Sequence, residues 1–131
     1  MSTGSELLAI AAGGALGAVL RAALHRGSAR IGRGHRLPIG PALATLVANG
    51  LGCLALSAWL HATPVTPAEA AFAWADPLVT IGLCGGLTTF STLCGDTVRL
   101  DRADRRAAIL YLLATLVVGM CGWSLGAAIG A

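Results

Sequence analysis

The chain has 131 residues, of which 56% are hydrophobic and only 11% are charged. Soluble domains carry roughly 25% charged residues, so a water-soluble fold of this size would lack the charges that cover a polar surface. Intrinsic disorder is excluded as well, because so much apolar side chain does not remain solvated. The net charge of +3 does not indicate nucleic-acid binding, since no soluble surface exists to carry a basic patch. The composition indicates an integral membrane protein.

Four segments of 18, 22, 19 and 25 residues are almost free of charge: Leu7–Leu24, Ile39–Leu60, Pro77–Gly95 and Ala107–Ala131. A helix needs about 20 apolar residues to cross the hydrocarbon core of a bilayer. We therefore expect one all-α membrane domain over residues 1–131, with four transmembrane helices. No basic stretch precedes the first segment, so we expect a retained helix rather than a cleaved secretory signal.

The arginines outside these segments lie in two of the three connections. The first connection, His25–Pro38, and the third, Asp96–Arg106, hold four arginines each, whereas His61–Asp76 and both termini hold none. Short loops that carry positive charge remain in the cytoplasm. This pattern predicts a multi-pass protein of the cell membrane with both termini outside. A split of eight arginines to none predicts a single, fixed orientation.

Small and polar residues mark one face of each of the first two helices. Gly13, Gly17 and Arg21 lie four residues apart, and the glycines allow a neighbouring backbone to approach closely. Arg21 either extends to the cytoplasmic interface or places a positive charge at the vestibule of an anion path. Thr45 and Asn49 form a polar stripe on the second helix. An amide near the middle of a span must be hydrogen-bonded or hydrated, so Asn49 either joins helices or lines a pore.

The third segment contains the most informative stretch, Gly-Gly-Leu-Thr-Thr-Phe-Ser-Thr at residues 85–92. Two glycines followed by four hydroxyl residues within five positions disfavour a continuous helix. Irregular backbone at membrane depth is tolerated only where it is buried in protein or lines a cavity. A helix broken here would expose carbonyls to a cation and amides to an anion. The alternative is a kinked helix that serves packing alone.

The fourth segment carries Tyr111, Thr115 and Gly119 at a spacing of four residues, which places them on one face. We expect Asp96 at the end of the third helix, so the spans would contain no carboxylate. A proton-coupled small-molecule exporter needs such a carboxylate, and this reading is disfavoured for that reason. No set of nucleophile, base and metal-ligand residues converges, so we do not expect an enzyme.

These motifs together resemble the Fluc (CrcB) family of fluoride channels along almost the whole chain. The string at residues 85–92 is the most specific match. The supporting matches are Gly13-Gly14-x-x-Gly17-Ala18-x-x-Arg21, Thr45-Leu46-x-x-Asn49-x-x-Gly52 and Tyr111-x-x-x-Thr115.

The resemblance implies an antiparallel dimer with two pores that lets fluoride leave the cytoplasm passively across the lipid bilayer. It also implies a structural Na⁺, which is not transported, at the dimer centre. Carried over residue by residue, the Na⁺ ligands would be the backbone carbonyls of Gly85 and Thr88. The anion path would use five side chains: Phe90, Asn49, Thr45 and Thr115, with Arg21 at the vestibule.

Three positions depart from the family pattern. Leu93 stands where a second Phe is usual, Gly119 where a second hydroxyl is usual, and Asp96 where Glu is usual. A chain with one fixed orientation cannot form an antiparallel homodimer. The sequence therefore predicts a heterodimer with an oppositely oriented paralogous subunit and at most one intact pore. The alternative is a non-conducting scaffold subunit that mainly supplies the Na⁺ site.

Overall fold

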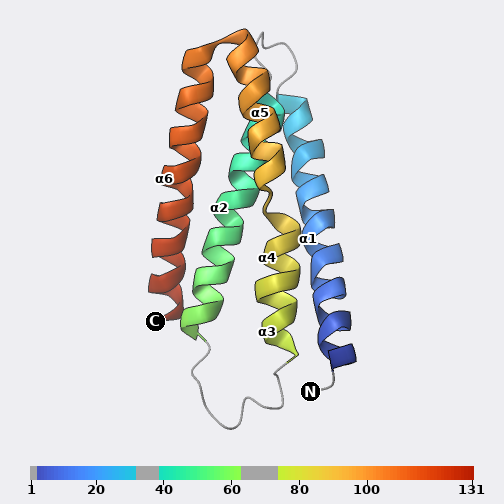
Figure 1. The fold of residues 1–131 in the computed structure, drawn as a ribbon. Helices are drawn as coiled ribbons and strands as arrows, with labels where there is room; N and C mark the ends of the chain where they lie inside the picture. The colour runs from blue at the N-terminus through green and yellow to red at the C-terminus, as the bar shows by residue number, and fades with distance from the viewer. Residues whose placement is uncertain (1–2, 32–38, 63–73) are drawn as a thin grey trace.

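The computed structural model describes residues 3–31, 39–62 and 74–131. Every regular element in these residues is helical (Figure 1). The elements are α1 (Thr3–Ile31), α2 (Ile39–Ala62), α3 (Ala75–Pro77), η2 (Leu78–Leu83), α4 (Cys84–Leu87), α5 (Phe90–Ala103) and α6 (Arg105–Gly130). The expected all-α class is confirmed.

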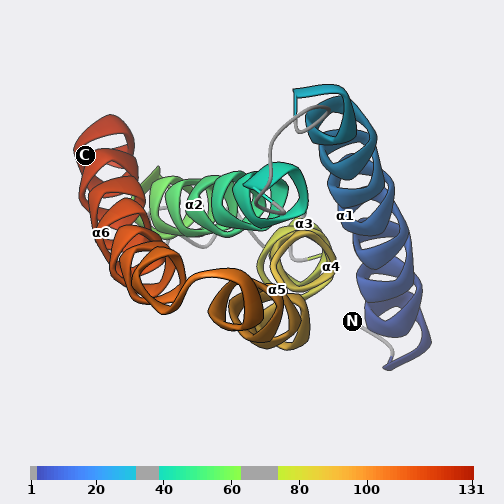
Figure 2. The same cartoon turned by 90° about the horizontal axis from the view of Figure 1, so that it is seen from above.

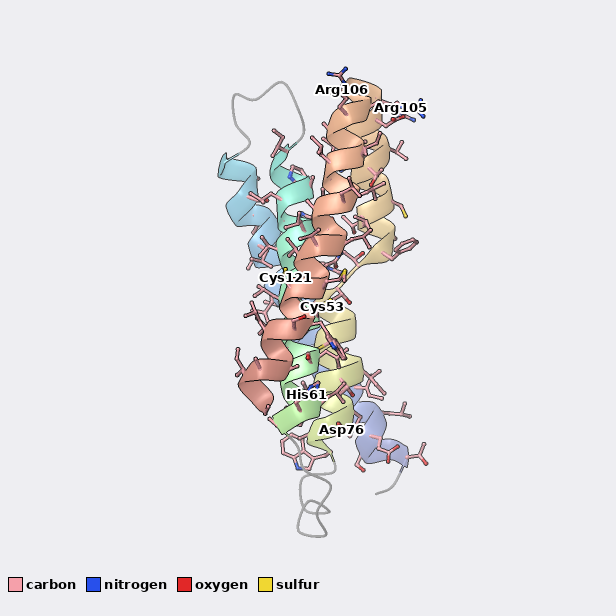
Figure 3. All side chains as sticks on the ribbon, turned by 90° about the vertical axis from the view of Figure 1, so that its left-hand side faces the viewer. Cys53, His61, Asp76, Arg105, Arg106 and Cys121 are labelled. Atoms are coloured by element: carbon pink, nitrogen blue, oxygen red, sulfur yellow. The ribbon has the colours of Figure 1, made fainter. Side chains whose placement is uncertain are left out.

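Four stretches are long and apolar enough to cross a membrane: Thr3–Ala29, Ile39–Ala62, Ala75–Ala103 and Arg105–Gly130. They confirm the four predicted spans, and the third consists of α3, η2, α4 and α5 in sequence. The described ends of the chain lie at the same end of the bundle (Figure 1). Arg105 and Arg106, from the arginine-rich third connection, lie at one end of the bundle (Figure 3). His61 and Asp76, the first and last residues of the predicted arginine-free second connection, lie at the opposite end.

The helices extend beyond the apolar segments at the arginine-rich end, and there the predicted connections are wrong. α1 continues to Ile31, and the third connection shrinks to Asp104, the single residue between α5 and α6. The Asp104 side chain accepts a hydrogen bond of 2.8 Å from the Arg106 backbone N–H, which caps α6. Charged residues outside the hydrocarbon core can stay helical because water and caps satisfy the helix ends. The remaining parts of the first and second connections, 32–38 and 63–73, lie outside the described residues.

Viewed from above, α2 lies between α1 and α6, and α4 and α5 lie along one side of it (Figure 2). Glycines set the close contacts. A Cβ on Gly17 would collide with the backbone of Leu83 and Leu87, and one on Gly126 would collide with the backbone of Leu54 and Ala58. The predicted small-residue stripe on α1 is therefore a packing surface, and α6 presents a second one. Bulkier side chains on either would separate the helices.

Candidate functional site: a broken span beside a groove

The third span is interrupted between α4 and α5, as the sequence predicts. Thr88 and Thr89 have extended backbone angles (φ −79°, ψ 153° and φ −154°, ψ 119°) between two helical segments. The interruption falls near the middle of the Ala75–Ala103 span and is visible as a short coil above α4 (Figure 1).

The hydroxyls of the sequence string cap the two helix ends at this break. The Thr88 backbone N–H and its Oγ1 both donate to the Cys84 carbonyl oxygen at 2.9 Å, which closes the end of α4. Thr89 Oγ1 accepts a hydrogen bond of 3.3 Å from the Thr92 N–H at the start of α5. Threonine suits both positions because its side chain competes with regular helical hydrogen bonding.

Two neighbouring helices contact the backbone of the break. Asn49 on α2 accepts a hydrogen bond of 2.9 Å from the Thr89 N–H and donates one of 3.4 Å to the Thr89 carbonyl. Arg21 on α1 donates from Nη1 to the Thr88 carbonyl at 3.5 Å. In this chain the Arg21 guanidinium therefore reaches the break instead of extending only toward the helix end.

A groove of about 670 Å³ runs beside the break, between α2, the third span and α6. Five of the residues that the sequence singled out contribute to its lining: Asn49, Gly85, Thr88, Phe90 and Thr115. Gly119 lines it as well, and none of the described residues lining it is charged. The rest of the lining is mainly apolar, and Cys53 on α2 marks this face at mid-height (Figure 3).

Phe90 and Leu93 take opposite environments although both lie at the start of α5. The Phe90 side chain is 78% exposed, so in a bilayer it faces lipid or another chain. Leu93 packs inward against a buried cluster that includes Leu100 and Tyr111. The position where the resembled family usually has a second Phe thus lies against the core of this chain.

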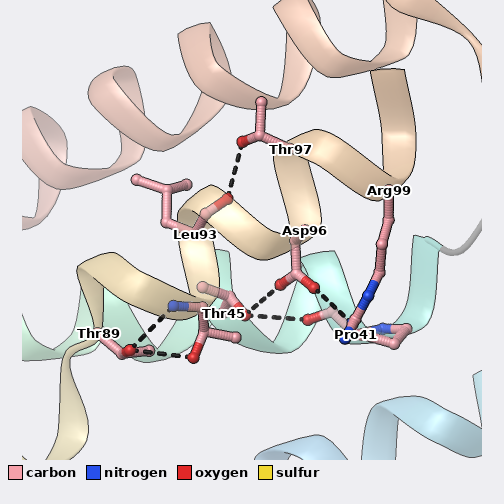
Figure 4. Close-up of polar contacts among 8 residues, drawn as sticks. Pro41, Thr45, Thr89, Leu93, Asp96, Thr97 and Arg99 are labelled. Carbon is pink, nitrogen blue, oxygen red and sulfur yellow. Dashed lines mark hydrogen bonds and ion pairs between the residues drawn. The ribbon is translucent and has the colours of Figure 1, made fainter. Parts of the chain in front are cut away.

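Thr45 lies apart from the groove. It is fully buried. Its hydroxyl lies within donating distance of two acceptors, Asp96 Oδ2 at 2.7 Å and the Pro41 carbonyl oxygen at 3.2 Å (Figure 4). Asp96 is 2% exposed and contacts Arg99 at 3.3 Å. The expectation that Asp96 ends the helix is wrong: α5 continues for seven more residues to Ala103. The expectation that the spans contain no carboxylate is wrong as well, because Asp96 is buried within the Ala75–Ala103 span, where Thr45 and Arg99 are its partners.

The Thr115 hydroxyl at the groove makes a local hydrogen bond, whereas the Tyr111 hydroxyl lies outside the groove lining. Thr115 Oγ1 donates to the Tyr111 carbonyl oxygen at 2.9 Å on its own helix. The Tyr111 hydroxyl is buried and has no hydrogen-bond partner among the described residues. Since hydroxyl groups rotate, Thr115 can offer either its proton or its lone pairs to the groove.

The end of α4 has the chemistry of a hard-cation site. The last carbonyls of a helix lack helical partners and carry partial negative charge. Gly85 and Thr88 both line the groove, and a Cβ on Gly85 would meet nothing within 4 Å, so this backbone is accessible. The described residues contain no cluster of three His, Cys, Asp or Glu side chains that could hold a metal ion.

The fold and the groove define a class: a multi-pass helical membrane protein with a broken span beside a mainly apolar groove that carries a few polar side chains. The family model described as "CrcB-like protein, Camphor Resistance (CrcB)" matches residues 8–127. The chain belongs to this family.

Proteins named as fluoride-specific ion channels, which are not enzymes, are among its relatives. The channel of Methanopyrus kandleri is 40% identical over 88% of this chain and 81% of its own length. That of Rhodopirellula baltica is 36% identical over 92% of this chain and 88% of its own length. Channel 1 of Thermobifida fusca is 40% identical over 95% of this chain and 87% of its own length.

Proposed function

We propose that this chain is a subunit of a fluoride channel in the cell membrane, through which fluoride leaves the cytoplasm passively and so becomes less toxic. The observation that carries the proposal is the broken third span, with Phe90, Asn49 and Thr115 gathered along one groove. The relatives named as fluoride-specific ion channels support the choice of ion. The four spans supply the membrane setting.

The groove residues can replace part of the water that fluoride loses on entry. A small, strongly hydrated anion must exchange its water for hydrogen-bond donors or positive edges. Asn49 uses one of its two N–H groups on Thr89 and keeps the other for an anion. The exposed Phe90 ring presents a positive edge. Arg21 does not line the groove and places its positive charge at the break, so a role at a vestibule stays a prediction from the resemblance.

Thr45 belongs to the proposed path only if the bond to Asp96 opens. Its complete burial and its 2.7 Å contact with Asp96 support a structural role in the present state. Thr115, in contrast, lines the groove and needs only to rotate its hydroxyl.

We propose further that the carbonyls of Gly85 and Thr88 would hold a structural Na⁺. Sodium would offset the partial negative charge at the end of α4. Two carbonyls do not surround a cation, so a second chain would have to complete the ligand set. The Arg21 contact with the Thr88 carbonyl leaves the other lone pair of that oxygen available.

The second chain is proposed to be an oppositely oriented paralogue rather than another copy. The support is the split of arginines between the connections, which fixes one orientation. Relatives in Shouchella clausii and Thermobifida fusca carry the names FluC 2 and FluC 1, which indicates numbered family members in those organisms. A pore face that leaves Phe90 78% exposed suits a partner that covers it.

A non-conducting scaffold subunit is the second candidate, and Leu93 and Gly119 favour it. Leu93 supplies no ring to the groove because it packs in the core, and Gly119 supplies no hydroxyl. A scaffold would tolerate Phe90→Ile and lose function only when the break itself is disturbed. A conducting subunit would lose flux with Phe90→Ile.

Growth of a bacterial strain that lacks its own fluoride export tests the proposal. Expression of this chain with its paralogue should restore growth in millimolar fluoride, and Phe90→Ile should abolish the rescue. Cys121→Ser, on the exposed face of α6, is the matched control and should rescue fully. Absence of rescue by any pairing, with both chains present in the membrane, would contradict the proposed function.

A further inference from the structure

The break creates a problem that the third span cannot solve with its own residues. Ending α4 and restarting at α5 removes helical partners from backbone N–H and carbonyl groups. In the apolar interior of a membrane each such group must find another partner. Capping by Thr88 and Thr89 hydroxyls satisfies the Cys84 carbonyl and the Thr92 N–H, and the Thr89 carbonyl begins the hydrogen bonding of α5 as its N-cap. The Thr89 N–H remains without a helical partner.

Asn49 supplies the missing partner and adds a second, longer hydrogen bond. Its Oδ1 accepts the Thr89 N–H at 2.9 Å, and its Nδ2 donates to the Thr89 carbonyl at 3.4 Å. The side-chain amide thus pairs with one residue as a neighbouring β-strand would. The extended angles of Thr89 (φ −154°, ψ 119°) suit this pairing.

The face of α2 that carries Asn49 is also shaped to receive the break. Gly52 lies three residues further along the helix, and a Cβ there would collide with the Thr88 methyl group. The absence of a side chain at Gly52 lets Thr88 lie against α2, while Asn49 holds the next residue. Both features act on the same two-residue break.

We infer that Asn49 is a positioning residue: it holds the third span in its broken form and so fixes the places of the Thr88 carbonyl and of Phe90. The inference rests on the proposed function, because it assigns the cause of the geometry that the pore and the Na⁺ site need. The positioning role and a pore-lining role of Asn49 depend on different atoms of its side chain. The clamp depends chiefly on Oδ1 as an acceptor, whereas an anion would use only an N–H of Nδ2.

The sharpest test removes the Thr89 N–H without changing any side chain. Threonine's α-hydroxy acid at position 89 replaces that amide with an ester, which cannot donate to Asn49 Oδ1. With the parent pair conducting, we expect the ester and Asn49→Ala each to lower fluoride efflux about tenfold. The double variant should stay within about twofold of either single one, because both changes remove the same interaction.

An ester at position 97, inside the continuous part of α5, is the matched control and should change efflux less than about twofold. Normal efflux through the position-89 ester, or multiplied losses in the double variant, would overturn the inference and leave Asn49 as a pore ligand alone. If the parent pair itself does not conduct, the proposed function fails instead.

A second readout needs no flux and covers the case in which Asn49→Ala fails to assemble. Amide hydrogen exchange in lipid nanodiscs should show the Thr89 N–H protected in the parent and about tenfold faster to exchange in Asn49→Leu than in Cys121→Ser. Leucine retains about the size of the asparagine side chain but removes the oxygen that accepts the Thr89 N–H. Equal exchange rates in all three proteins would contradict the clamp.

Discussion

The two halves of the third span are held in place by different kinds of contact. The half formed by η2 and α4 packs backbone against backbone on α1, at Gly13, Gly17, Gly82 and Gly86. The other half, α5, is bound by side chains, above all by the buried contact of Asp96 with Thr45. The position of the first half depends on close backbone packing, which any added side chain would disrupt, whereas the position of the second half depends on a specific hydrogen bond. The break joins the two, and Asn49 and Arg21 meet it from both sides.

The largest effect is expected where the backbones touch. Gly17→Val places a side chain against the backbone of Leu83 and Leu87 and should destabilise the bundle by about 3 kcal/mol, at the upper end for overpacked sites. SDS titration in mixed micelles, followed by tryptophan fluorescence, measures this. Gly27→Ala on the same helix meets nothing within 4 Å and should leave stability unchanged or raise it by up to about 1 kcal/mol, because alanine favours a helix more than glycine does. Equal stability of the two variants would show that the halves do not differ as described.

Thr45→Val should have an intermediate effect. Valine keeps the shape of threonine but leaves the buried Asp96 carboxyl without its 2.7 Å partner, a loss of about 1–3 kcal/mol. Thr97→Val is the control, because its hydroxyl bonds only to the Leu93 carbonyl on the same helix. A variant with normal stability and reduced fluoride flux would instead place Thr45 in the anion path.

The smallest effect is expected at Arg99. Its side chain is 64% exposed and meets Asp96 at 3.3 Å, and such pairs contribute about 0–1 kcal/mol. Arg99→Gln should therefore lower stability by less than Thr45→Val in the same titration. A larger loss than that of Thr45→Val would show that the ion pair, and not the threonine, holds α5.

The sequence predicts the break because glycine and threonine residues in one string disfavour a continuous helix whatever surrounds them. It also predicts the glycine contacts, since small residues four apart form a stripe on any helix. It does not predict that Thr45 meets Asp96, because these residues are 51 positions apart and only the packing of α5 on α2 brings them together. The short third connection had a local signal that was missed, namely Asp104 as the cap of α6.

The role of Asn49 is predicted only in part by the sequence. Its position near the middle of a span predicts that the amide is hydrogen-bonded. The two alternatives, joining helices or lining a pore, remain equal in the sequence because neither partner is near in the chain. The structure shows that the same side chain contacts the break and lines the groove.

We propose that this chain conducts fluoride only as one half of an oppositely oriented pair. Fluoride efflux from liposomes, recorded with a fluoride electrode, is measured with this chain alone and then with a candidate paralogue of opposite orientation. We expect efflux from the pair and none from the chain alone at equal protein content. Efflux from the chain alone would contradict the fixed orientation and show that Leu93 and Gly119 are compatible with a working pore.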